Sequence, residues 1–147
     1  MIFYVKIKSM SAASDFKKKT PEGDLAIRTL AMPADTNPRG DIFGGWVVSQ
    51  MDLAGLSVAG KYAPHSVVTV AIESMVFLSP IRVGDFICCY AQLMKIGRTS
   101  LQVKIETWAV SADEADTNRR QVTEGIFTYV AVDAKGQSEP ALKQPKR

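Results

Sequence analysis

The chain has 147 residues, of which 46% are hydrophobic and 22% are charged, and its formal net charge at pH 7 is +3. This length predicts one domain with a buried core, and the composition is ordinary for a globular protein. The charge is too small to indicate nucleic-acid binding, although it suits an anionic small ligand. No apolar run approaches the roughly 20 residues of a membrane-spanning helix, so we expect no membrane insertion.

Both ends of the chain predict tails. Residues 1–23 and 136–147 are mostly small, polar or charged and show no core-forming periodicity, which is typical of disordered segments. We therefore expect one folded domain over residues 24–135.

The first part of this domain predicts a strand, a loop and a helix. Residues 25–31 read as a strand, and the loop "ADTNPRGDIFGGW" follows. Residues 44–60 predict a helix of about four turns. It is mostly apolar, and its polar side chains fall on one side: Ser49, Gln50, Asp52 and Ser57. Such a helix is largely buried, with one polar face directed at something specific.

Four strand-like runs follow, over residues 66–78, 86–96, 99–110 and 121–132. Their apolar alternation and short connections predict an antiparallel sheet. We expect an α+β fold in which an antiparallel sheet of about five strands wraps a long central helix. Because one helix cannot cover both faces and the edges of that sheet, we also expect an oligomer.

Several kinds of site are excluded or disfavoured. The sequence has no P-loop, no G-x-S-x-G motif and no G-x-G-x-x-G motif after a strand. His65 is the only histidine, which excludes a multi-histidine metal site. Cys88 and Cys89 are adjacent and point to opposite faces of a strand, so a disulfide between them would be strained. The pair favours packing roles and a reducing, cytoplasmic setting.

The remaining chemistry is that of a carboxylate beside a helix start. Asp41 lies three residues before Gly44 and Gly45. The first amides of a helix are unpaired and carry partial positive charge, and glycine allows a reacting group to approach them closely. Such amides can polarise a carbonyl, while Asp41 can orient or deprotonate a water or attack directly. The alternative is that Asp41 only caps the helix or shapes a turn.

The chain resembles a known family over most of its length. "RTLAMPADTNPRGDIFGGWVVSQMDLAG", "VVTVAIESMVFLSPIRVGD", "CCYAQLMKIGRTSLQVKIETW" and "TEGIFTYVAVD" are similar to hotdog-fold acyl-CoA thioesterases of the bacterial YciA type. The resemblance covers residues 25–135. It implies a hotdog fold, a dimer with substrate at its interface, and further assembly as a trimer of dimers.

The resemblance also implies a reaction and its residues. Acyl-CoA would be hydrolysed to coenzyme A and a carboxylic acid, with short to medium acyl groups and without metal or redox cofactor. Asp41 in "GDIFGG" would be the catalytic aspartate, and the amides of Gly44, Gly45 or their neighbours would polarise the thioester carbonyl. Asn37 matches the "TN" of the pattern, with a loop-shaping or assisting role.

Coenzyme A carries phosphates, for which arginine is the favoured partner. Arg82 in "SPIRVGD" and Arg98 in "KIGRTS" are candidates, with Thr99 and Ser100 as polar helpers. The alternative for each is a solvated turn residue.

Two alternatives stay open. Asp52 competes with Asp41, because other branches of the hotdog superfamily place their catalytic carboxylate on the helix. For the activity, the competitors are a non-catalytic acyl-CoA-binding protein and an acyl-thioester hydratase or dehydratase. The second usually needs an Asp/Glu–His pair, for which only His65 is available.

Overall fold

The computed structural model describes residues 5–7, 20–113 and 118–147. The chain forms one long helix and a sheet, and the expected helix and strands are confirmed to within one residue at each end. The strands are β1 (Val5–Ile7), β2 (Asp24–Leu30), β3 (Ser66–Phe77), β4 (Phe86–Ile96), β5 (Ser100–Val110) and β6 (Arg120–Val132). Between β2 and β3 lie η2 (Pro33–Asp35), α1 (Gly44–Ala59) and η3 (Gly60–Tyr62).

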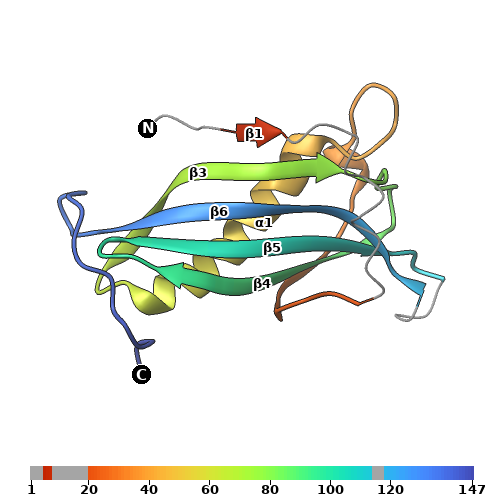
Figure 1. Cartoon of the computed structure of the whole chain (residues 1–147). Coiled ribbons are helices and arrows are strands. Elements are labelled where there is room, and N and C mark those ends of the chain that lie inside the picture. Colours follow the sequence, from red (N-terminus) through yellow and green to blue (C-terminus); the bar gives the residue numbers. More distant parts are fainter. Residues whose placement is uncertain (1–4, 8–19, 114–117) are drawn as a thin grey trace.

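The sheet has the strand order β1-β3-β6-β5-β4-β2 (Figure 1). The expected antiparallel sheet is confirmed, because β3, β6, β5, β4 and β2 pair antiparallel in that sequence. The short β1 adds a parallel pairing along part of β3, within a segment where no strand was expected. The rest of the expected N-terminal tail, residues 1–4 and 8–19, lies outside the described residues.

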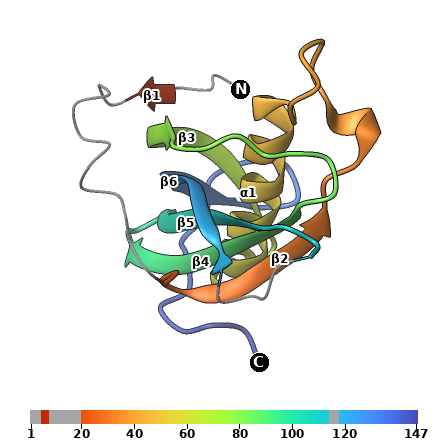
Figure 2. The same ribbon diagram turned by 90° about the vertical axis from the view of Figure 1, so that its right-hand side faces the viewer.

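Helix α1 crosses one face of the curved sheet, as Figures 1 and 2 show. Its buried residues recur on one stripe: Val47, Met51, Ala54, Gly55 and Ala59. Leu53 and Leu56 lie on the other side of the helix and are 52% and 41% exposed. Sixteen residues make the helix about 24 Å long. Figure 1 shows the helix running diagonally, with its two termini toward opposite ends of the sheet.

The middle of α1 is held against the sheet by one buried tyrosine. The hydroxyl of Tyr129 on β6 donates to the backbone carbonyl of Asp52 at 3.1 Å and lies 3.2 Å from its carboxylate Oδ1. Burial and the neighbouring Asp52 raise the pKa of Tyr129 above its usual range, so the hydroxyl keeps its proton. Gly55 leaves the space for this hydroxyl, since a Cβ there would lie 2.0 Å from it.

The face of the sheet away from α1 contains a buried charge. Glu106 on β5 is fully buried, and its carboxylate accepts a hydrogen bond from Trp108 Nε1 at 3.1 Å. Lys104 Nζ lies 3.3 Å from the same carboxylate. Because a buried charge is stable only when paired, this part of the second face is held by polar contacts within the chain.

The C-terminal segment, residues 136–147, follows β6 as a tail but is hydrogen-bonded to the domain. The Ala141 amide donates to the Arg98 carbonyl at 2.8 Å, and the Leu142 amide donates to the Tyr62 carbonyl at 2.7 Å. These bonds connect the end of the helical region to the β4–β5 turn. The end of the helical region and the β4–β5 turn therefore lie together, at the end of the sheet opposite the start of α1.

Substituting Gly55 by alanine should destabilise the protein, because the added methyl group collides with the Tyr129 hydroxyl. Overpacking of this kind costs about 1–3 kcal/mol, measured as the free energy of unfolding in denaturant. Gly60→Ala is the matched control, since a Cβ at Gly60 meets nothing within 4 Å and its φ of −59° is helical. Equal stability of the two variants would contradict the proposed packing.

Candidate active site

The loop that precedes α1 is organised by Asn37. The Asn37 Oδ1 accepts hydrogen bonds from the amides of Arg39 at 2.9 Å and Asp41 at 3.2 Å, and the Asn37 amide donates to the Asp41 carbonyl at 2.8 Å. Gly40 completes the turn with a φ of +87°, which favours glycine. Asn37 thus shapes the loop that presents Asp41.

Backbone hydrogen bonds hold this loop against the connection between β3 and β4. The Ile42 amide donates to the Ile81 carbonyl at 3.0 Å, and the Ala31 amide donates to the Asp85 carbonyl at 2.9 Å. Within the loop, the Phe43 amide donates to the Asp35 carbonyl at 2.8 Å. The start of α1 is consequently fixed at one end of the sheet.

The first amides of α1 are available to a ligand. The N-cap residue, Phe43, makes no side-chain cap, and its carbonyl already accepts the amides of Trp46 and Val47. Gly44 and Gly45 are both exposed, and their amides have no carbonyl one turn earlier to bond. They form a site of partial positive charge, and the Phe43 ring lies against Gly45.

The two candidate aspartates have different surroundings. Asp41 is half-buried, and within the described part of the chain its carboxylate has no hydrogen-bond or ion-pair partner. The Asp52 Oδ1 instead accepts a hydrogen bond from Thr69 Oγ1 at 2.6 Å and lies next to the Tyr129 hydroxyl. Asp52 therefore connects α1 to β3 and β6, whereas the Asp41 carboxylate is available for chemistry.

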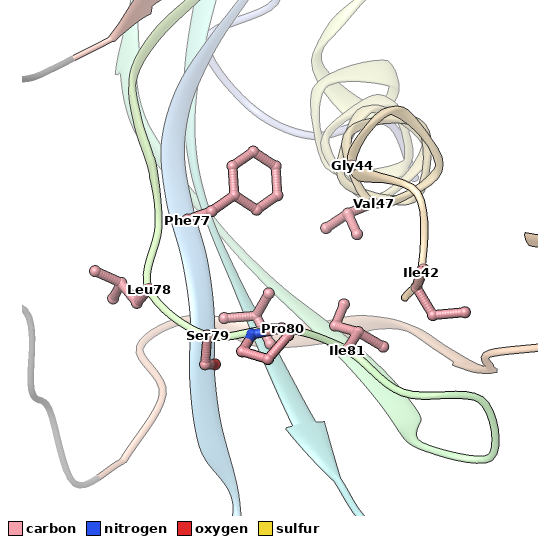
Figure 3. Close-up of a pocket in the computed structure, with 9 residues that line it drawn as sticks. Ile42, Gly44, Val47, Phe77, Leu78, Ser79, Pro80 and Ile81 are labelled. Carbon is pink, nitrogen blue, oxygen red and sulfur yellow. The ribbon is translucent and has the colours of Figure 1, made fainter. Parts of the chain in front are cut away.

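An apolar cavity of about 270 Å³ adjoins the helix start (Figure 3). Ile42, Gly44 and Val47 line it from the helix side, and Phe77 and Ile81 line it from the end of β3 and the connection to β4. Ligand pockets for drug-sized molecules begin at about 300 Å³. This cavity suits a short apolar group whose reactive end lies at the helix amides.

The candidate cations fall at opposite ends of the domain. Arg82 is exposed in the turn after Ile81, on the side of the cavity, and its amide donates to Asp85 Oδ2 at 3.0 Å. Arg98 and Thr99 form the β4–β5 turn, which Ser100 closes by accepting the Gly97 amide at 2.7 Å. A single chain thus brings Arg82 near Asp41 but leaves residues 98–100 at the far end.

The other reactive side chains lie away from the helix start or are inert. His65 Nδ1 lies 2.8 Å from Glu139 Oε1, where the C-terminal segment meets the start of β3. Burial raises the pKa of the Cys89 thiol to about 11, so it is not a nucleophile at neutral pH. Within residues 5–7, 20–113 and 118–147, no group of three or more metal-ligating side chains could hold an ion, and no helix is long and apolar enough to cross a membrane.

The residues that line the cavity were not identified from the sequence. Its walls include Val47, Phe77, Ile81 and Val122, which are distant in sequence and were read only as apolar core or strand residues. The sequence predicts a strand over residues 66–78 and a turn in "SPIRVGD", and a Pro-containing turn after an apolar strand gives no signal that its side chains line a cavity.

The chain is similar in sequence to known proteins. Residues 39–115 match the family model described as the Thioesterase superfamily. The "Acyl-CoA thioester hydrolase YciA" of Salmonella typhimurium is 52% identical over 122 residues, which are 82% of this chain and 92% of that protein.

Two solved structures show the same architecture. A "hexameric broad specificity acyl-coenzyme A thioesterase" superposes with a TM-score of 0.79 at 48% identity, covering 88% of each chain. A "hexameric hotdog fold thioesterase" of Campylobacter jejuni superposes with a TM-score of 0.76 at 41% identity, covering 81% of this chain and 90% of its own. With its helix wrapped by five antiparallel strands, this chain has the hotdog fold and belongs to the thioesterase superfamily.

Proposed function

We propose that the protein hydrolyses acyl-CoA thioesters to coenzyme A and carboxylic acids, accepting a broad range of short to medium acyl groups. The main support is the proximity of three features at the start of α1: the first helix amides, the apolar cavity, and the Asp41 carboxylate, which has no partner among the described residues. The named activities of the relatives agree with it.

In this proposal the acyl group enters the cavity and the thioester carbonyl oxygen faces the amides of Gly44 and Gly45. Asp41 takes a proton from a water as its oxygen bonds to the carbonyl carbon, and the amides stabilise the resulting oxyanion. The oxyanion then re-forms the carbonyl, the carbon–sulfur bond breaks, and the thiolate receives the proton from Asp41. The products are a carboxylic acid and the free thiol of coenzyme A.

The phosphates of coenzyme A require cations outside the cavity. Arg82 is the nearest candidate in the same chain, because it follows the cavity residue Ile81. Asn37 assists by holding the Asp41 loop. Arg98, Thr99 and Ser100 can contribute only from a second copy of the chain, since the β4–β5 turn lies at the opposite end of the sheet from Asp41.

The proposed assembly is a hexamer built as a trimer of dimers. Leu53 and Leu56 expose apolar surface along α1, and an exposed apolar row favours association. The two solved relatives described above are hexamers. Cys88 and Cys89, both free thiols and buried, fit the proposed cytoplasmic location.

The competing activities have less support. A hydratase or dehydratase would need a histidine beside the carboxylate, and His65 instead contacts Glu139 at the other end of the sheet. A non-catalytic acyl-CoA-binding protein would share the cavity but release no thiol. Detection of free coenzyme A with a thiol reagent distinguishes it from a hydrolase.

Asp41→Asn should lower kcat about a hundredfold or more, because it removes a positioned base while keeping the side-chain shape. Asp52→Asn should keep most of the activity, since the amide oxygen can still accept from Thr69 and Tyr129. Steady-state kinetics with both variants, checked by thermal melting, make the comparison. A folded, inactive Asp52→Asn beside an active Asp41→Asn would reverse the assignment.

Gly44→Pro should remove one carbonyl-polarising amide without disturbing the helix. Proline is favoured at the first helical position, and Phe43 already has the extended conformation (φ −65°, ψ 128°) that a following proline requires. We expect kcat to fall about 10²-fold or more, the usual effect of losing an oxyanion donor.

The matched control is Gly44→Ala, which keeps the amide and places its methyl group 3.7 Å from the Phe77 ring, an ordinary contact. The alanine variant should stay near wild type in kcat. A Gly44→Pro enzyme with wild-type kcat would exclude the Gly44 amide as a donor.

Arg82→Ala should raise KM for acyl-CoA about tenfold with little change in kcat, because a charge-assisted contact to phosphate contributes about 1.5–3 kcal/mol. The comparison substrate is the same acyl group on pantetheine, which lacks the nucleotide. The KM for this pantetheine substrate should be equal in the wild type and in Arg82→Ala. An equal rise in KM for acyl-CoA and for acyl-pantetheine would show that Arg82 acts on the fold or on the acyl group instead.

A further inference from the structure

Phe77 lies at the boundary between the cavity and the surface. It is the last residue of β3, its ring lines the cavity, and 51% of its surface is exposed. Figure 3 shows the ring pointing from β3 toward Gly44 and Val47, whereas Leu78 points away. A Cβ on Gly44 would lie 3.7 Å from its Cζ atom, so the ring reaches across to the helix start and narrows the cavity there.

A bulge in β3 directs this ring inward. Between Glu73 and Val76 the strand advances three positions while β6 advances two, and Ser74 within the bulge has a φ of +59°. Without the extra residue, strand alternation would place Phe77 on the same face as Glu73. The bulge instead pairs Phe77 with the fully buried Thr123 of β6, on the helix side. Bulges that redirect one side chain occur preferentially beside functional sites.

A substrate can displace the Phe77 ring more easily than the core side chains of the cavity wall. Val47 and Ile81 are 2% and 3% exposed and belong to the packed core, so moving them disrupts close packing. Phe77 is half exposed and lies outside the core cluster. An acyl chain that displaces Phe77 therefore disturbs less core packing than one that displaces Val47 or Ile81.

We propose that Phe77 sets the upper limit on acyl chain length, with the β3 bulge as its positioning element. This inference rests on the proposed thioester hydrolysis at the helix start. Removing the ring joins its volume to the cavity, and added methylenes of a longer chain are then buried in place of the ring. Each buried methylene is worth about fourfold in binding, so discrimination against longer chains falls.

The test is the chain-length profile of kcat/KM for butanoyl-, hexanoyl-, octanoyl- and dodecanoyl-CoA. Phe77→Ala should raise the ratio of octanoyl-CoA to butanoyl-CoA about tenfold or more relative to wild type, within the range that a hydrophobic pocket achieves. Phe77→Trp, with a larger ring, should lower the same ratio. Thermal melting confirms that each variant is folded.

Two controls keep the ring in place. Ser74→Gly retains a residue that readily adopts the positive φ of the bulge, and Met94→Ala removes an apolar side chain of similar exposure, 54%, near the far end of β4. Both should keep the wild-type profile. Active Phe77 variants with an unchanged profile, or an equal shift in Met94→Ala, would overturn the role of Phe77. Absence of hydrolysis in the wild type for every acyl-CoA would overturn the proposed function itself.

Discussion

The hydrogen bond from the Ile42 amide to the Ile81 carbonyl determines where helix α1 begins relative to the sheet. It joins the loop before the helix to the connection after β3, two segments that are distant in sequence. The cavity lies between these two segments, and Asp41 directly precedes the bonded residue. The position of the carboxylate, the amides and the acyl cavity thus depends on this one backbone contact and its neighbours in the same loop.

The arrangement provides the electrostatic part of catalysis before any substrate binds. Hydrogen bonds hold the helix at its start through the loop and at its middle through Tyr129, which orients the helix amides. Donors that are already oriented stabilise a developing oxyanion without reorganising in the transition state. Asp52 also holds the helix to the sheet through Thr69, which explains a carboxylate on the helix without giving it a role in bond breaking.

The elements of the fold could be predicted from the sequence because their signals are local. Apolar alternation in β5 and the mostly apolar run of α1 identify strand and helix directly. The carboxylate and glycines of the site were also recognisable, because they are close together in "GDIFGG" and precede a helix. The expected roles of Arg82 and Arg98 could not be ranked, since their distance from Asp41 depends on which end of the sheet each turn reaches.

The features that sequence alone did not predict depend on pairing between distant strands. The bulge that turns Phe77 inward is a difference in register between β3 and β6, and nothing in the strand's own alternation specifies it. The partner of Asp52, Tyr129, lies 77 residues away. Cavity residues from α1, β3 and β6 become neighbours only after the sheet has closed around the helix.

The central claim, that the reaction takes place at the start of α1, is tested most directly by a crystal structure with an unreactive substrate analogue. A butanoyl-CoA analogue with a methylene group in place of the thioester sulfur keeps the carbonyl but cannot be hydrolysed. We expect its carbonyl oxygen at about 2.7–3.1 Å from the amide of Gly44 or Gly45, with Asp41 beside the carbonyl carbon and the acyl chain between Val47 and Phe77. A carbonyl bound beside Asp52, away from the helix amides, would contradict this account.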